Sequence, residues 1–122
     1  MRADGMIIEH KQYYEKMLEK GRLIPFVSNG VLHGFLTFYI TNNEKNFTDA
    51  DPWAVLEDNP DGHIVYLAQL ITNKDPDNVR LIHRHYHGFI KYIKDNFKNV
   101  DTAYWRQWDF KKKVLRTFRK NI

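Results

Sequence analysis

The residues whose types and spacing suit chemistry best are histidines. His83 and His87 stand four residues apart in a segment of helical periodicity, so they share one helix face, a spacing that can hold zinc. The residues between them lack the glutamate of a metallopeptidase helix. The chain has no cysteine, and only His33 or His63 offers itself as a third ligand. We therefore expect surface histidines and no metal site.

Other catalytic signatures are absent from the sequence. It contains no Gly-x-Ser-x-Gly elbow and no phosphate-binding P-loop. The lack of cysteine excludes disulfides, thiolate metal sites and a cysteine nucleophile. Any catalytic side chain in this protein must therefore act through an oxygen or a nitrogen atom.

Charge is divided unevenly along the chain. Residues 42–62 carry six acidic residues and one lysine, a net charge of −5, whereas residues 105–122 carry a net charge of +6. The basic segment interleaves Arg and Lys with Trp105, Trp108, Phe110 and Phe118, which can stack bases while the cations neutralise phosphates. An amphipathic terminal element with core aromatics has the same composition. We favour core packing and keep nucleic-acid binding through 105–122 as an alternative.

Length and composition indicate one domain spanning 1–122. Hydrophobic residues make up 43% and aromatics 15%, enough for a single packed core. No apolar run reaches the roughly 18 residues of a membrane span, and the N-terminal stretch is polar and amphipathic, unlike a signal peptide. We expect a cytoplasmic protein with no membrane partner.

The first half of the chain predicts a helix followed by a hairpin. Apolar residues recur at helical spacing over 6–20. Strands are predicted at Leu23–Val27 and Val31–Thr41, joined by an Asn-Gly turn, with Pro25 restricting the first to an edge or a bulge. Side chains of the second strand are predicted to alternate between two faces, with Leu32, Leu36, Phe38 and Ile40 on one and His33, Phe35, Thr37 and Tyr39 on the other. Residues 42–62 form a long polar connection with a short strand or a helical turn.

The second half predicts a strand, a helix and a strand. His63–Thr72 is apolar on both faces, with Ile71 on the face of Val65 and Leu67, which indicates a central strand. A helical stripe runs from Val79 to Phe97, with Asp77 or Asn78 as N-cap. Thr102–Trp108 predicts a strand parallel to the central one, and 110–120 fits helix or strand. The fold class is α/β, a mixed central sheet with helices on its faces.

This element order resembles the GNAT superfamily of N-acetyltransferases. Ile24–Phe35, with its hairpin turn and Gly34-Phe35 pair, is similar to the second and third strands of that family, and Tyr66–Thr72 is similar to the fourth. The resemblance covers roughly residues 10–108. It implies a GNAT-like fold, acetyl-CoA as cofactor and transfer of an acetyl group to an amine.

The resemblance also implies a set of site residues. Leu70, Ile71 and Thr72 would meet the pantetheine arm, and Tyr104 would serve as general acid. The family motif Arg/Gln-x-x-Gly-x-Gly/Ala corresponds to 73–83, which contains no glycine, so side chains stand where phosphates need a close backbone approach. The phosphate end of the cofactor would lie near Asn78, Val79, Arg80 and Arg84.

Two alternatives to an acyltransferase follow from the absence of glycine in 73–83 and from the charge pattern. One is a non-catalytic GNAT-like domain that binds a protein or another ligand. The other is a nucleic-acid-binding module that uses the basic C-terminus. If the chain is an acyltransferase, acetyl-CoA should raise its stability. If the chain binds nucleic acid, the binding affinity should fall steeply as the salt concentration rises.

Overall fold

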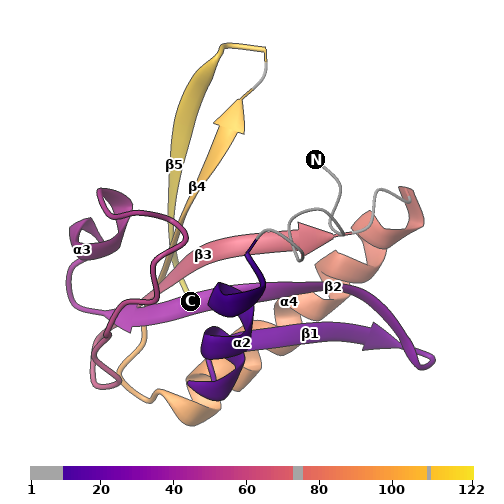
Figure 1. The fold of residues 1–122 in the computed structure, drawn as a ribbon, viewed down its shortest axis with the longest axis horizontal. Coiled ribbons are helices and arrows are strands. Elements are labelled where there is room, and N and C mark those ends of the chain that lie inside the picture. Colours follow the sequence, from indigo (N-terminus) through magenta and orange to yellow (C-terminus); the bar gives the residue numbers. More distant parts are fainter. Residues whose placement is uncertain (1–9, 73–75, 110) are drawn as a thin grey trace.

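The computed structural model describes residues 10–72, 76–109 and 111–122. They form three helices and one five-stranded sheet (Figure 1). Strand order follows the sequence, and β3 and β4 are the parallel pair among antiparallel neighbours. The α/β class with a mixed sheet is thereby confirmed. In chain order the elements are α2 (Lys11–Glu19), β1 (Leu23–Ser28), β2 (Val31–Thr41), α3 (Lys45–Thr48), β3 (Ile64–Thr72), α4 (Pro76–Asn96), β4 (Thr102–Asp109) and β5 (Val114–Asn121).

The β1–β2 hairpin forms where the Asn-Gly pair predicted it. Asn29 and Gly30 have φ angles of 53° and 76°, the left-handed values of a primed two-residue turn, and Ser28 pairs with Val31. β1 lies at the edge of the sheet, which explains why Pro25 is tolerated there.

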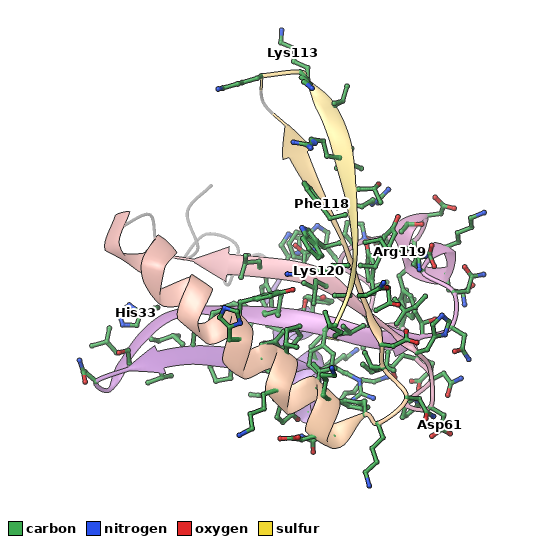
Figure 2. The ribbon with its side chains drawn as sticks, turned by 180° about the vertical axis from the view of Figure 1, so that it is seen from behind. His33, Asp61, Lys113, Phe118, Arg119 and Lys120 are labelled. Atoms are coloured by element: carbon green, nitrogen blue, oxygen red, sulfur yellow. The ribbon has the colours of Figure 1, made fainter. Side chains whose placement is uncertain are left out.

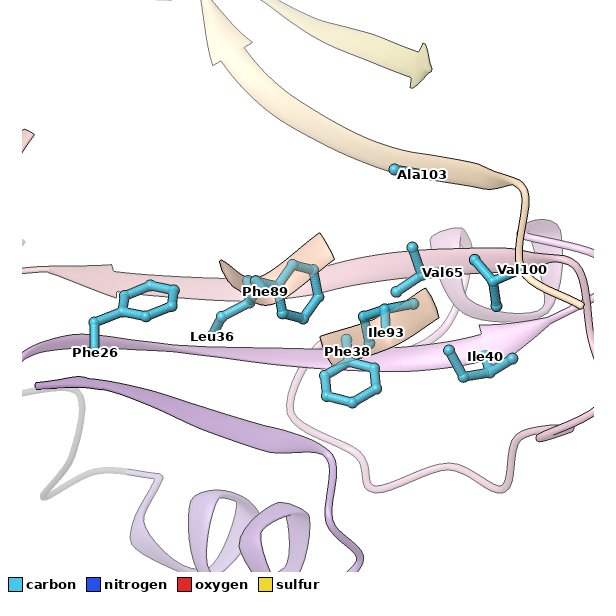
Figure 3. Packing of buried hydrophobic residues seen from close by; sticks show 9 residues of the cluster. All are labelled: Phe26, Leu36, Phe38, Ile40, Val65, Phe89, Ile93, Val100 and Ala103. Carbon is cyan, nitrogen blue, oxygen red and sulfur yellow. The ribbon is translucent and has the colours of Figure 1, made fainter. Parts of the chain in front are cut away.

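Two apolar layers cover the two faces of the sheet. On one face Phe38 and Ile40 of β2 pack with Phe89 and Ile93 of α4, as Figure 3 shows. On the other face Tyr39 packs with residues of α2, including Met17, whose side chain is fully buried. The alternation predicted for β2 is therefore confirmed from Phe35 to Ile40, and it determines which helix lies on which face. Nearer the turn, a register shift between β1 and β2 interrupts the alternation.

The structure corrects two predictions in the second half of the chain and decides between the two alternatives left open for 110–120. A bulge in β3 places Ile71 on the α2 face, opposite to the predicted side, because one extra residue reverses the alternation that follows. Helix α4 begins at Pro76, so Asp77 and Asn78 lie inside its first turn and neither is the N-cap. Within 110–120 the structure has strand β5 from Val114 onward instead of a helix.

At the N-terminal end, the predicted helix over 6–20 corresponds to α2 at Lys11–Glu19, and the expected residues 6–9 lie outside the described part. None of the helices in the described part is both long enough and apolar enough to cross a membrane.

The acidic connection between β2 and β3 is packed against the body. Asp58 accepts a hydrogen bond from Arg22 Nε at 2.8 Å and another from the Ile40 backbone N–H at 2.8 Å. Gly62 approaches the Thr41 backbone so closely that a Cβ would lie 2.5 Å from the Thr41 carbonyl carbon. These contacts place the connection along the end of β2, beside the point where β3 begins.

Candidate functional site

The most unusual feature of the sheet is the short pairing between its two parallel strands. β3 and β4 share only the pairs from Ile64–Thr102 to Tyr66–Tyr104. Beyond them β3 continues to Thr72 beside β2, and β4 continues to Asp109 beside β5, so the two strands diverge (Figure 1). We call this divergence the splay. Over the length of the splay, the facing backbone edges of β3 and β4 form no hydrogen-bonded ladder with each other. Their peptide groups can therefore form hydrogen bonds with a ligand.

The bulge in β3 lies at the beginning of the splay. Phe38 pairs with Leu67 and Thr37 with Gln69, so Ala68 is the extra residue. Ala68 packs on the α2 face of the sheet and Leu67 on the α4 face. Bulges redirect backbone groups and end regular pairing, so this one contributes to the separation of the strands.

A pocket of about 90 Å³ opens at the same point. It lies on the α2 face and is lined by both diverging strands, through Tyr66 and Ala68 of β3 and Arg106 of β4. The acidic connection supplies the opposite wall, which includes Phe47 and Asp51. The pocket has room for a small chemical group and not for a whole nucleotide cofactor.

The walls of the pocket are held by specific contacts. Arg106 Nη2 donates to the Thr48 carbonyl at 2.8 Å, which ties β4 to α3. The Tyr39 hydroxyl donates to the Ala54 carbonyl at 3.2 Å and accepts from the Leu56 N–H at 3.3 Å. These bonds fix the acidic connection against the sheet, so it forms a packed wall.

Aromatic rings form a continuous column beside the pocket. Tyr39 stacks on Phe47 with centroids 4.4 Å apart, Phe47 on Tyr66 at 5.8 Å, and Tyr66 on Tyr104 at 5.9 Å. The guanidinium of Arg119 lies 5.5 Å from the Tyr104 ring centroid at the end of the column. The stacked rings position Tyr104 at the last parallel pair, beside the splay.

Charge at the site is mixed. Burial raises the pKa of Tyr66, and the positive charge of Arg106 opposes that rise. A hydrogen bond from its own backbone N–H lowers the pKa of Glu44, and its partner Arg119 lowers it further. The pocket lining therefore includes one carboxylate, Asp51, and one cation, Arg106, and outside the pocket the Glu44–Arg119 pair joins the start of α3 to β5.

The residues predicted for the site are distributed over the two diverging strands and the start of α4. Tyr104 is half-buried at the beginning of the splay, and Leu70 is 53% exposed on β3. Ile71 is buried in the α2-side core and presents only its backbone to the splay. Thr72 ends β3, and the first turns of α4 carry Asn78, Val79, Arg80 and Arg84, whose side chains lie outside the described part.

Several site residues were not predicted from the sequence. Ala68 and Gln69 form the bulge, and neither residue type signals one. Arg106 enters the pocket because it follows Tyr104 by two positions on a strand, a spacing that points both side chains to the same face. The two-residue spacing from Tyr104 could have identified Arg106 from the sequence. The wall formed by Phe47 and Asp51 could not be identified in this way, because it depends on tertiary packing.

The histidines do not assemble into a metal site among the described residues. No group of three His, Asp or Glu side chains that could hold an ion occurs in that part of the chain. His87 is exposed on α4, and the side chain of His83 lies outside the described part.

Comparison of the sequence with protein-family models and with curated proteins finds no match. Residue chemistry and fold geometry therefore carry the functional proposal.

Proposed function

We propose that this chain is a divergent GNAT-like acyltransferase that binds the pantetheine arm of acetyl-CoA in the splay and transfers the acetyl group to a small amine. The splay is the observation that carries the proposal. Two parallel strands that pair at only three positions leave a free backbone edge from Leu67 to Ile71. A pantetheine arm carries two amides, which pair with such an edge as a further strand would.

The phosphate end of the cofactor is accommodated differently from the family pattern. Residues 73–83 contain no glycine, so side chains would keep the backbone from approaching a pyrophosphate closely. Helix α4 begins four residues after the end of β3, and Arg80 is the fifth residue of the helix. We expect affinity to come mainly from the pantetheine arm, with Arg80 and Arg84 as the cations available to the phosphates.

The pocket at the beginning of the splay is where the acceptor amine enters. It opens on the face opposite to α4, so an amine there approaches a thioester in the splay from the side of the acidic connection. Acetyl-CoA supplies an activated acyl group. The Asp51 carboxylate attracts the acceptor while it is still an ammonium ion.

Tyr104 is the proposed general acid. As the acceptor nitrogen bonds to the acyl carbon and the carbon–sulfur bond breaks, Tyr104 donates its hydroxyl proton to the departing sulfur. The ammonium ion first loses one proton to water, which frees the lone pair that attacks. The second proton, lost by the nitrogen on acylation, returns through water to the tyrosine, so the enzyme is regenerated and one proton is released to solvent. The stack on Tyr66 and the cation of Arg119 hold the ring in place.

Thermal unfolding tests the binding step. Acetyl-CoA at a hundredfold excess over its dissociation constant should stabilise the protein by about 2.7 kcal/mol, and pantetheine should also raise the unfolding temperature. Because the basic C-terminus attracts phosphates, adenosine 3′,5′-diphosphate is the control and should have little effect at 0.3 M salt, an ionic strength chosen to screen exposed charges.

The opposite pattern would overturn this account of binding. A shift with the diphosphate that equals the shift with acetyl-CoA would mean that phosphate attraction alone explains the effect. No shift with any of these ligands at millimolar concentration would favour the non-catalytic binding domain over the enzyme.

A further inference from the structure

The Tyr86 side chain of α4 ends in a buried hydroxyl group that the proposed mechanism does not use. In the described part of the chain this hydroxyl has no hydrogen-bond partner. Burial also raises the pKa of Tyr86, so at neutral pH the hydroxyl keeps its proton and remains a donor. Because a buried donor without an acceptor destabilises a fold, such a group points to a partner that the chain itself does not contain.

Contacts place Tyr86 on the α4 side of the splay. Tyr86 precedes Phe89 by three positions, and Phe89 packs on Phe38 of β2, so both side chains of α4 face the sheet. The Tyr86 ring centroid also lies 6.0 Å from the Nζ atom of Lys120. Lys120 belongs to β5, pairs with Ala103 of β4 and lies near the base of the β4–β5 hairpin (Figure 2). Since α4 packs on β2 and β3, its contact with β5 crosses the line along which β3 and β4 diverge.

An exposed apolar side chain lies on the same face of the splay. Leu70 of β3 pairs with Leu36 of β2, whose side chain is buried in the α4-side core. Paired residues point to the same face of a sheet, so Leu70 also points to the α4 side. It is nevertheless 53% exposed, which leaves an apolar surface beside the free backbone edge of β3.

The surroundings of the Tyr86 hydroxyl favour a carbonyl oxygen as its acceptor. No carboxylate pairs with Lys120 among the residues that the structure describes, so its ammonium group favours an oxygen with partial negative charge nearby. A phosphate would bring a full charge to an enclosed hydroxyl, at a large cost in desolvation. A pantetheine arm offers neutral amide oxygens, and its methyl groups can cover Leu70.

We propose that Tyr86 is a binding residue for the pantetheine arm, one of whose amide carbonyls accepts a hydrogen bond from the Tyr86 hydroxyl on the α4 side of the splay. This inference rests on the proposed function, because it requires the arm to lie in the splay. The backbone edge of β3 and the Tyr86 hydroxyl then hold the arm together. The pocket on the α2 face stays open to the acceptor.

Replacing Tyr86 with phenylalanine should change stability and affinity in opposite directions. Without ligand, Tyr86→Phe removes the unpartnered hydroxyl, so the melting temperature should rise by about 3 °C. For pantetheine, which carries no phosphate, the dissociation constant should rise about 5-fold because one hydrogen bond is lost. Thermal unfolding measures the first effect, and a calorimetric titration with pantetheine measures the second.

Two other tyrosines provide matched controls. The Tyr14 hydroxyl is also buried without a partner in the described ranges, but it belongs to α2 on the opposite face of the sheet. Tyr14→Phe should therefore raise the melting temperature in the same way and leave the affinity for pantetheine unchanged. Tyr92 lies on α4 and is 41% exposed, so Tyr92→Phe should change neither quantity.

The outcomes separate this inference from the proposed function. If the wild-type chain binds pantetheine and Tyr86→Phe binds it equally well, the inference is wrong and the acyltransferase proposal stands. A lower melting temperature for Tyr86→Phe would also overturn the inference, because the hydroxyl would then have a stabilising partner in the ligand-free protein. If the wild-type chain binds no pantetheine at millimolar concentration, both proposals are overturned.

Discussion

Replacing Asp58 with alanine should lower the free energy of unfolding by about 3 kcal/mol, because it leaves the Arg22 guanidinium buried without its partner. Asp58 is 5% exposed and Arg22 is 11% exposed, so water cannot replace the lost bond well. The substitution also removes the acceptor of the Ile40 backbone N–H. Chemical denaturation measures the free energy, and the melting temperature should fall by roughly 10 °C.

A neighbouring carboxylate provides the control for this prediction. Glu57 pairs with Lys20, yet its side chain is 96% exposed, so Glu57→Ala should leave stability almost unchanged. The double variant R22A/D58A should be less destabilised than the sum of the two single variants. Simple additivity would mean that the pair does not hold the acidic connection in place.

Replacing Tyr104 with phenylalanine should lower kcat for acetyl transfer by about 100-fold, because the ring remains but its proton is lost. The affinity for acetyl-CoA should not change, since the pantetheine arm is bound by the backbone edge of β3. Release of the free thiol from acetyl-CoA, with ethylamine and ethanolamine as acceptors, measures the rate.

The control for this catalytic prediction is another tyrosine of the same chain. Tyr92 lies on α4 and is 41% exposed, so Tyr92→Phe should retain full activity. An unchanged kcat in Tyr104→Phe would exclude Tyr104 as the general acid. A loss of activity accompanied by a loss of stability would identify the tyrosine as a structural member of the aromatic column.

Local patterns were sufficient to predict most of the elements. The alternation in Val31–Thr41 identified both faces of β2, because each face meets a different apolar layer. The Asn29-Gly30 pair predicted its turn, because both positions require positive φ. The long apolar stripe that ends at Phe97 predicted helix α4, but it did not predict the residue at which the helix begins.

The sequence was least informative where one residue changes the geometry. The bulge at Ala68 reverses the faces of the rest of β3, and alanine and glutamine are compatible with either side of a strand. Residues 110–120 fitted both periodicities, since the turn before β5 has Lys113 at a φ of 52° and contains no glycine or asparagine.

Long-range contacts explain why the site itself was predicted only in part. Tyr104 was suggested by the resemblance to the GNAT family, and it forms the last parallel pair of β3 and β4 with Tyr66. The wall formed by Phe47 and Asp51 is held beside β4 by the hydrogen bond from Arg106 to the Thr48 carbonyl, whose partners are 58 positions apart. No local pattern reports such a contact.

The most direct test of the central claim is a titration of ¹⁵N-labelled protein with acetyl-CoA, followed by amide chemical shifts. Binding in the splay predicts saturable shifts at the amides of 67–71 and 104–106, with the β1–β2 turn at 28–31 unmoved. Shifts confined to 111–120 would instead mean that phosphate attraction to the hairpin is the whole effect. Either that result or the absence of any shift at millimolar acetyl-CoA would contradict the account.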